Sequence, residues 1–231
     1  MAVSRSVVYQ QIPLDLQLRA EATFDNFVSA GNEALLHTLR ESDERYIYLW
    51  GDEASGKTHL LQALCHQAYQ LDKTAAYIPL RDDDISAPEI LDGLETLDLV
   101  CLDDLEGIAG QAKWEMALFN LFNLIRDKGG RLLISASFAP NKTNIQLADL
   151  VSRLNWGVVF QIANLQDQDK IEVLQLRAGQ LGLELSTEVA EYLLKRSPRD
   201  MANLFSLLGR LDTASLTEQR RLTIPFVRQY L

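Results

Sequence analysis

The sequence predicts an α/β fold, with a parallel sheet sandwiched by helices and a small all-helical domain after it. Three observations carry this prediction. Between residues 23 and 165, short and nearly continuous apolar runs alternate with longer amphipathic segments, a pattern typical of buried parallel strands joined by helices. One glycine-rich loop lies directly between such a run and the amphipathic segment that follows it. After about Asn164 the strand-like runs stop and only helical spacing remains.

Each expected element follows from this alternation. Five apolar runs are expected as strands, at residues 46–50, 75–80, 97–103, 131–135 and 158–162. Four segments between them are expected as helices, at residues 33–41, 57–71, 87–94 and 113–127. Four further helices are expected at residues 167–181, 187–195, 199–211 and 224–230, with Gly182 and Pro198 at their junctions.

The chain divides into three parts on this basis. Residues 1–22 read as an extended arm, since Pro13 excludes a helix interior. Residues 23–165 form the expected α/β domain, and residues 166–231 form the expected helical domain. At 231 residues the chain is long enough for this arrangement.

Composition narrows the class of protein. The formal net charge of −10, with acidic runs such as Asp82 to Asp84, disfavours a primary role in gripping DNA. No apolar run approaches the roughly 20 residues that cross a bilayer, and the N-terminus lacks the apolar core of a signal peptide. Cys65 and Cys101 fall in apolar patterns typical of reduced core residues. We therefore expect a cytoplasmic protein with no membrane partner.

The loop Gly51–Thr58, GDEASGKT, is a complete G-x-x-x-x-G-K-[ST] motif between a predicted strand and a predicted helix. Its glycines let successive backbone N–H groups point inward, and the N-terminus of the following helix adds partial positive charge. Lys57 is expected to reach the β- and γ-phosphates, and the Thr58 hydroxyl to ligate Mg²⁺. The motif therefore predicts a bound nucleoside phosphate. The residues assigned to its site are Gly51, Ser55, Gly56, Lys57, Thr58 and His59.

A second part of the predicted site follows the strand at residues 97–103. That strand delivers Asp103 and Asp104 at its carboxyl end, the edge where ligands of open α/β sheets bind. Asp103 would hold the Mg²⁺ shell, and Asp104 could polarise a water that attacks the γ-phosphate. Two acids after a strand can also form a solvated turn, but the phosphate loop upstream favours the functional interpretation. Ser135 or Ser137, after the next strand, could sense the γ-phosphate or simply form a turn.

Beyond these motifs, several stretches resemble a known family, the DnaA branch of the AAA+ ATPases and its short regulatory homologues. The resemblance covers nearly the whole chain. Its most diagnostic stretches are TFDNFV at 23–28, the phosphate loop, Asp103-Asp104, SRLNWG at 152–157 and LTIPFV at 222–227. The resemblance implies an AAA+ P-loop domain with an all-helical lid, bound ADP or ATP, and Mg²⁺.

The family also implies roles for individual residues. Val28 and its neighbours would contact the nucleotide base, and Ser137 falls at the first sensor, where DnaA proteins often carry an acid. Arg153 matches the arginine finger, which serves a nucleotide on a neighbouring subunit. Arg199 matches the second sensor, which reaches this chain's own phosphates from the lid.

Two differences from DnaA bear on the expected function. The sequence ends at Leu231, directly after the lid, with no helix-turn-helix domain, so no sequence-specific DNA binding is expected. In place of the long N-terminal region of DnaA there are about twenty residues. The acidic balance agrees with the first difference.

The N-terminal arm contains a short peptide with one apolar edge. Ile12, Leu14 and Leu16 alternate in an extended segment, with Gln11 as a polar handle. The run resembles the Q-L-x-L-P-L motif that binds the bacterial sliding clamp, the β subunit of DNA polymerase III, with Asp15 in place of the usual Pro. The alternative is a strand that packs on its own domain.

Together these features predict a negative regulator of replication initiation. It would bind the sliding clamp, dock on DnaA and stimulate hydrolysis of DnaA-bound ATP through Arg153, leaving inactive ADP-DnaA and preventing re-initiation. In this interpretation the chain is not itself an enzyme, although weak hydrolysis of its own nucleotide is compatible with its motifs. Two rivals are a stand-alone AAA+ ATPase and a helicase-loader-like adaptor. Assembly of the chain into a homo-oligomer is left open.

Overall fold

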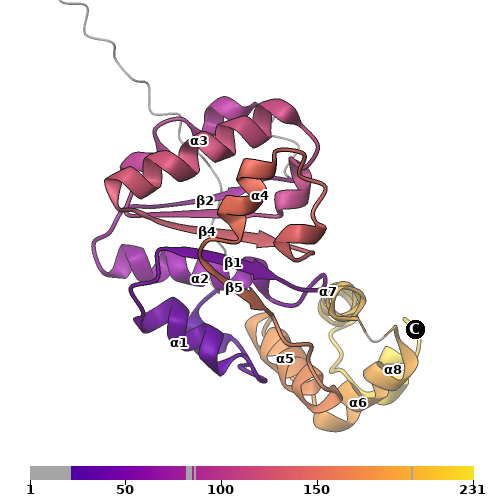
Figure 1. The fold of residues 1–231 in the computed structure, drawn as a ribbon. Helices are drawn as coiled ribbons and strands as arrows, with labels where there is room; N and C mark the ends of the chain where they lie inside the picture. The colour runs from indigo at the N-terminus through magenta and orange to yellow at the C-terminus, as the bar shows by residue number, and fades with distance from the viewer. Residues whose placement is uncertain (1–21, 82–84, 86, 199) are drawn as a thin grey trace, which may run out of the picture.

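The computed structural model describes residues 22–81, 85, 87–198 and 200–231, and within them it contains one five-stranded sheet (Figure 1). The strand order is β2-β3-β4-β1-β5, and every neighbouring pair is parallel. The carboxyl ends of these strands therefore share one edge of the sheet, as the sequence predicted. The strands are β1 Tyr46–Trp50, β2 Ala75–Pro79, β3 Leu99–Asp103, β4 Arg131–Ala136 and β5 Val158–Gln161.

Helices cover both faces of this sheet (Figure 1). One face carries α1 and α2, and the opposite face carries α3 and α4. These helices are α1 Glu33–Glu41, α2 Lys57–Gln70, α3 Ala112–Lys128 and α4 Ala148–Leu154. Short 3-10 turns lie at Phe24–Asn26, Pro88–Leu91, Leu94–Thr96, Leu105–Gly107 and Pro140–Lys142.

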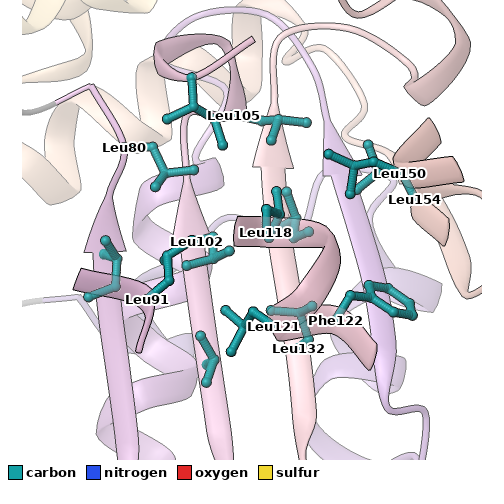
Figure 2. Close-up of a cluster of buried hydrophobic side chains, with 14 of the residues drawn as sticks. Leu80, Leu91, Leu102, Leu105, Leu118, Leu121, Phe122, Leu132, Leu150 and Leu154 are labelled. Carbon is teal, nitrogen blue, oxygen red and sulfur yellow. The ribbon is translucent and has the colours of Figure 1, made fainter. Parts of the chain in front are cut away.

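Side chains of the central strands alternate between two apolar clusters. On β3, Leu99 and Cys101 join the cluster under α1 and α2, whereas Val100 and Leu102 join the cluster under α3 and α4. In Figure 2, side chains of α3 such as Leu118 lie over the strands in this second cluster. Burial on both faces explains why these strands appear in the sequence as continuous apolar runs. Cys65 and Cys101 are buried and unpaired, as expected.

One helix prediction was wrong. Residues 87–94 do not form an α-helix but contribute to two 3-10 turns, Pro88–Leu91 and Leu94–Thr96. The backbone N–H groups of Ile90 and Asp92 donate to the carbonyl oxygens three residues earlier, Ala87 and Glu89, and Gly93 adopts a φ of 84°, which is outside the helical region. Its apolar residues still pack on the sheet, and that burial is the periodicity from which a helix was predicted.

After β5 the chain forms the lid, four helices with an apolar core of their own. They are α5 Asp167–Gln180, α6 Thr187–Arg196, α7 Met201–Glu218 and α8 Ile224–Val227. The seventh helix was predicted at 199–211; it begins later, at Met201, because Asp200 caps its start, and it ends later, at Glu218, as apolar residues such as Ala214 continue past Leu211. The eighth is shorter than the predicted 224–230. Among the described residues, no helix has the length and apolar character needed to span a bilayer.

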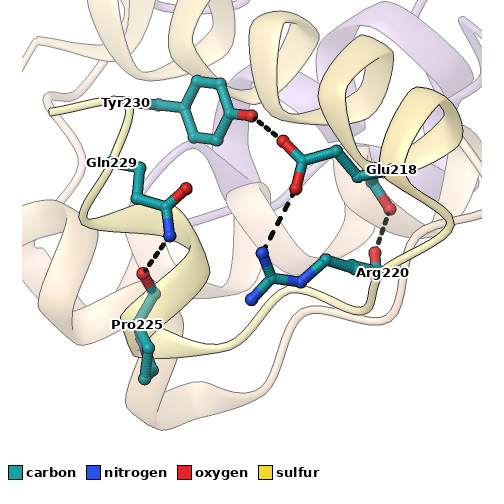
Figure 3. A network of polar contacts seen from close by, with 6 residues as sticks. Glu218, Arg220, Pro225, Gln229 and Tyr230 are labelled. Atoms are coloured by element: carbon teal, nitrogen blue, oxygen red, sulfur yellow. Dashed lines mark hydrogen bonds and ion pairs between the residues drawn. The ribbon is translucent and has the colours of Figure 1, made fainter.

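Polar contacts attach the end of the chain to α7 (Figure 3). The Tyr230 hydroxyl donates to Glu218 Oε1 at 2.6 Å, and Arg220 Nη1 donates to Glu218 Oε2 at 3.2 Å. Arg210 Nη2 donates to the carbonyl oxygen of Tyr230 at 2.6 Å. These bonds fix the last residues of the chain against α7.

Candidate functional site

The loop Gly51–Thr58 leaves the carboxyl end of β1 and leads directly into α2. Gly56 adopts a φ of 100°, in the region that favours glycine, and a Cβ there would lie 2.6 Å from Cε2 of Phe27. A side chain at this position is therefore excluded by the backbone and by the neighbouring ring. Lys57 is buried, and its Nζ donates to the carbonyl oxygens of Gly51 and Asp52, both at 2.8 Å.

Features of the same loop fit a phosphate group. The hydroxyl of Ser55 is buried and has no hydrogen-bond partner among the residues that the structure describes. The first turn of α2, from Lys57 onward, supplies N–H groups that have no acceptor within the helix. An anion bound at this turn would receive those hydrogen bonds and the favourable end of the helix dipole.

Asp103 is a buried carboxylate that accepts hydrogen bonds from three hydroxyl groups. Thr58 Oγ1 donates to its Oδ2 at 2.6 Å, and the Tyr77 hydroxyl donates to the same oxygen at 2.7 Å. Ser135 Oγ donates to Oδ1. These donors compensate for the burial of the charge and fix the orientation of the carboxylate. Burial, together with the negative charge of Asp103, raises the pKa of Tyr77, so its hydroxyl stays a donor.

Thr58 and Asp103 also fit a magnesium ion. Both side chains present the oxygen donors that Mg²⁺ takes in proteins, usually one or two groups alongside phosphate oxygens and water. In the described part of the chain, no cluster of three or more His, Cys, Asp or Glu side chains is suited to a metal. Phosphate oxygens and water would supply the rest of the shell of an ion held by Thr58 and Asp103.

Asp104 has an unusual backbone conformation next to this group. Its φ and ψ are 58° and 60°, and its N–H donates to Ser135 Oγ at 3.0 Å. Burial and the charge of Asp103 raise the pKa of Asp104, whereas Arg81 and Lys57 oppose the shift. In turn, burial lowers the pKa of Lys57, and the nearby Asp104 opposes that shift. Left-handed backbone of this kind is a strain that functional sites often carry.

The segment before α1 packs against the start of α2. His59 Nε2 donates to the carbonyl oxygen of Thr23 at 2.7 Å, and the rings of His59 and Phe27 lie 5.7 Å apart. The Phe27 ring also covers Gly56, as described above. His59 therefore anchors this segment beside the loop. Val28, expected at the nucleotide base, is half-buried.

A cavity of about 550 Å³ lies between the phosphate loop and the lid. This volume is in the range of ligand pockets. Six residues predicted from the sequence line it, namely Gly56, Lys57, Thr58, His59, Asp104 and Ser137. Four others are not among its lining residues, namely Val28, Gly51, Ser55 and Asp103.

Several lining residues were not predicted from the sequence. Arg81 reaches the cavity from the end of β2, and Arg177 reaches it from α5. The remaining lid contribution is mostly apolar, from Val173, Leu176, Leu181 and Phe205. Arg81 could have been found, because it follows a predicted strand at the edge where ligands bind. The lid residues carry no local signal, because only tertiary folding turns them towards the loop.

The structure separates the two serine alternatives. Ser135 is buried and holds Asp103 and Asp104, whereas Ser137 lines the cavity. The N–H of Ser137 donates to Glu106 Oε1, and the other carboxylate oxygen of Glu106 is buried with no hydrogen-bond partner within the described part of the chain. Of the two serines, Ser137 is therefore the one placed to meet a ligand.

Arg153 lies on α4, away from this cavity. Gly157, a few residues later, passes so close to β1 that a Cβ there would lie 2.0 Å from the carbonyl oxygen of Tyr46. This places the end of α4 beside the first residue of β1, whereas the phosphate loop follows the last, Trp50. The two ends of β1 are about 13 Å apart at 3.3 Å per residue. Arg153 is accordingly not among the residues lining the cavity.

A buried carboxylate binds the backbone of the segment that leads into α4. Glu115 of α3 accepts hydrogen bonds from the N–H groups of Gly110, Gln146 and Leu147, at 2.7, 2.9 and 2.8 Å. Two of these donors directly precede α4. Glu115 therefore occupies the position of a capping group for the helix that carries Arg153.

Five predicted site residues lie outside the described residues. They are Gln11, Ile12, Leu14 and Leu16 of the arm, and Arg199 between α6 and α7. Their assignments stay predictions.

Comparison with known proteins gives two family matches that together span most of the chain. Residues 18–161 match the family described as the bacterial DnaA ATPase domain. Residues 167–231 match the family described as the lid domain of Hda.

Solved structures of the same fold cover nearly the whole chain. Domain III of the replication initiation protein DnaA from Thermotoga maritima has a TM-score of 0.81 at 22% identity, covering 93% of this chain and 97% of that one. AMPPCP-bound DnaA from Aquifex aeolicus has a TM-score of 0.70 at 22% identity, covering 87% and 68%. The RuvB Holliday junction branch migration motor of T. maritima has a TM-score of 0.67 at 16% identity, covering 93% and 72%. At these identities the likeness concerns the fold.

Proposed function

The chain belongs to the family of the bacterial DnaA ATPase domain, and from this premise we propose that it is a nucleotide-bound regulator that acts on DnaA. Its fold is that of an AAA+ domain, with a parallel sheet between helices and an all-helical lid. The lid is of the Hda type, which favours a DnaA-related regulator over an initiator.

The position of Arg153 is the observation that carries this proposal. Arg153 lies near the first residue of β1, at the opposite end of the strand from the phosphate loop. It does not line the cavity beside that loop. An arginine so placed suits a nucleotide on another subunit. In other NTPases an arginine finger stabilises the charge of the transition state and raises hydrolysis by about 10³–10⁵. We assign this role to Arg153 at the ATP of DnaA.

The chain's own nucleotide would have a different task. Gly56, Lys57 and Thr58 would bind its phosphates, and Thr58 with Asp103 would hold Mg²⁺, which neutralises phosphate charge when bound. The lid side of the cavity would cover the rest of the nucleotide. We infer that ADP at this site fixes the lid against the α/β domain, so that the lid and Arg153 keep one arrangement relative to each other.

The N-terminal arm completes the proposal. Gln11 to Leu16 would bind the sliding clamp, which places the regulator at newly replicated DNA. DnaA would then be converted to its inactive ADP form and a second initiation prevented. A pull-down with separate clamp and helicase baits tests this against a helicase-loader-like adaptor. Gln11→Ala and Leu14→Ala should lose the clamp, and retention of a helicase instead would contradict the proposal.

The test of the central claim is hydrolysis of DnaA-bound ATP in the presence of the clamp loaded on DNA. The wild-type chain should stimulate hydrolysis, and Arg153→Ala should abolish most of the stimulation. Arg196→Ala is a matched control, because Arg196 also lies over an aromatic ring, that of Tyr192 in the lid. Equal stimulation by the wild type and Arg153→Ala would remove the finger assignment.

One observation favours a second candidate, a stand-alone ATPase. Lys57, Thr58 and Asp104 line one cavity, with Asp103 bound to Thr58 behind them. Turnover by the isolated chain at about 1 s⁻¹ or faster, within the usual enzyme range, would favour this candidate. Near-stoichiometric ADP retained on purification would favour the regulator.

A further inference from the structure

Trp156 is a large side chain that remains 53% exposed, two residues beyond the end of α4. Its ring is nonetheless fixed from below. It stacks on Tyr46 with centroids 5.9 Å apart and planes 3° apart, and on Phe122 at 6.1 Å. Tyr46 and Phe122 stack on each other at 4.7 Å. The exposed indole is therefore the outermost of three stacked rings, of which the ring of Phe122 is buried in the core.

Two arginines contact this ring. The Arg153 guanidinium carbon lies 4.9 Å from the ring centroid, and that of Arg126, on α3, lies 5.8 Å from it. Both distances are within the range of a cation–π contact. Arg126 also forms an ion pair with Asp127 at 2.9 Å, so its charge is partly compensated.

Arg153 differs from Arg126 in this respect. Within the described part of the chain, no carboxylate is found in an ion pair with Arg153. Among those described residues the guanidinium contacts the ring and no carboxylate, which leaves its N–H donors available to a phosphate. Trp156 and Arg153 are also close in the sequence, three residues apart. The backbone N–H of Trp156 donates to the carbonyl oxygen of Arg153 at 3.0 Å.

We propose that Trp156 is a positioning residue for the arginine finger. The indole holds the guanidinium of Arg153 at the surface of the molecule before DnaA docks. A long arginine side chain otherwise loses rotamer freedom when it engages a phosphate, and this loss lowers the efficiency of the contact. The proposal rests on the finger role of Arg153 given above.

If Trp156 positions Arg153, its removal should affect the rate of ATP hydrolysis on DnaA and not the affinity with which the chain binds DnaA. Because the ring orients a group that acts in the transition state, its removal should lower the maximal rate and leave the half-saturating concentration nearly unchanged. The energy of a cation–π contact at an exposed site corresponds to a change in rate of about two- to fivefold. Loss of pre-organisation adds to this effect, so we expect the maximal rate to decrease about fivefold or more.

The experiment measures hydrolysis of DnaA-bound ATP at saturating clamp–DNA while the concentration of the full-length chain is varied. Trp156→Ala should lower the maximal rate at least fivefold and change the half-saturating concentration less than twofold. Trp156→Phe keeps a ring and should recover most of the rate. Tyr69→Ala, which truncates an aromatic residue that is 50% exposed on α2, should leave both values unchanged. Thermal unfolding of each variant identifies any loss of folding.

A double mutant separates positioning from general stability. In the Arg153→Ala background, Trp156→Ala should have no further effect on the rate, because the ring then has nothing to orient. A further decrease there would contradict the proposal. So would an unchanged maximal rate in Trp156→Ala, an increased one, or a failure of Trp156→Phe to recover activity while folded. If Arg153→Ala itself retains full stimulation, the proposed function fails together with this inference.

Discussion

At the scale of single residues, the site depends on hydroxyl groups gathered around the carboxylate of Asp103. Two of the three donors, Thr58 and Tyr77, share one oxygen atom, and Ser135 takes the other. Thr58 and Asp103 are the residues expected to hold Mg²⁺, so Tyr77 and Ser135 would influence a bound ion only through Asp103. Groups that orient a metal's partners in this way influence affinity nearly as strongly as the ligands themselves.

Tyr77→Phe tests this arrangement by removing one hydroxyl. We expect the gain in nucleotide affinity that Mg²⁺ provides to be about tenfold smaller than in the wild type, because Asp103 loses one of the donors that orient it. The measurement is the nucleotide dissociation constant as a function of Mg²⁺ concentration. In EDTA the variant should bind as the wild type does.

The matched control for this variant is Tyr69→Phe. The Tyr69 hydroxyl donates to the carbonyl oxygen of Ala75 at 2.8 Å, away from the cavity. An equal Mg²⁺ response in Tyr77→Phe and Tyr69→Phe would show that Tyr77 only supports the strand.

At the scale of elements, α4 has few residues and depends on a tertiary contact for its position. Its seven residues are too few to be stable as an isolated helix. Leu150 and Leu154 anchor it in the core, and Glu115 binds the N–H groups that precede it. The direction of Arg153 is therefore set partly by a carboxylate on α3.

Glu115→Gln should weaken this anchor. The amide keeps one acceptor but turns an N–H₂ group towards backbone donors, and hydrogen bonds to a charged group contribute about 1.5–3 kcal/mol each. We expect the free energy of unfolding to fall by at least about 1.5 kcal/mol, measured by urea denaturation. Stimulation of DnaA-bound ATP hydrolysis should fall as well, with nucleotide binding by the chain itself unchanged. Glu89→Gln, at an exposed position, is the control. Full stability in Glu115→Gln would contradict the role of the anchor.

The end of the lid has a pH dependence of its own. The Tyr230 hydroxyl holds the pKa of Glu218 below its ordinary value of 4.5, so the stabilisation from this bond is present above that value and is lost as the pH falls through the lowered pKa. The same bond raises the pKa of Tyr230 above 10.0, and the stabilisation is lost as the pH rises through the raised value. The contact should therefore persist between these two limits.

Tyr230→Phe should return the pKa of Glu218 towards 4.5, with part of the shift kept by Arg220. The measurement is an NMR titration of the Glu218 carboxyl carbon in the full chain. Tyr192→Phe, elsewhere in the lid, should leave the midpoint unchanged. A Glu218 midpoint that does not move in Tyr230→Phe would assign the shift to Arg220 instead.

At the scale of the whole molecule, the cavity exists only because the lid folds over the phosphate loop. Its loop side is mostly polar, whereas its lid side is largely apolar. A ligand that fills it would be polar at one end and flat or apolar at the other, as a nucleotide is. Ligand binding should then stabilise the lid and the α/β domain together.

Leu176→Glu tests the lid side of the cavity. Leu176 lines the cavity from α5 and is 40% exposed, so the change costs little core packing. It removes apolar surface from the site and adds a negative charge, and we expect nucleotide affinity to fall at least tenfold, measured by calorimetry. Leu216→Glu, at a position 71% exposed on α7, should bind as the wild type does. Unchanged affinity in Leu176→Glu would place the nucleotide elsewhere.

Sequence patterns were reliable where one physical cause dominates. The five strands were placed within two residues of their ends, and for β1, β3 and β4 the reason is that strands buried on both faces must be continuously apolar. The phosphate loop was predicted because its glycines have few other uses at that spacing. The segment 87–94 was wrong because apolar periodicity records burial, and burial does not require an α-helix.

The sequence by itself predicted the chemistry that follows two strands, namely Lys57 and Thr58 in the loop after β1 and Asp103 and Asp104 at the end of β3, and it left Ser135 and Ser137 as alternatives at the end of β4. Parallel strands must bring their carboxyl ends to one edge, so local patterns were sufficient. Only the tertiary structure decided that Tyr77 and Glu115 hold other groups in place, that Leu176 faces the loop, and that Arg153 rests on Trp156 away from its own cavity. These contacts join segments that are distant along the chain, or they depend on the direction in which a side chain points. Local sequence periodicity carries information on neither of these.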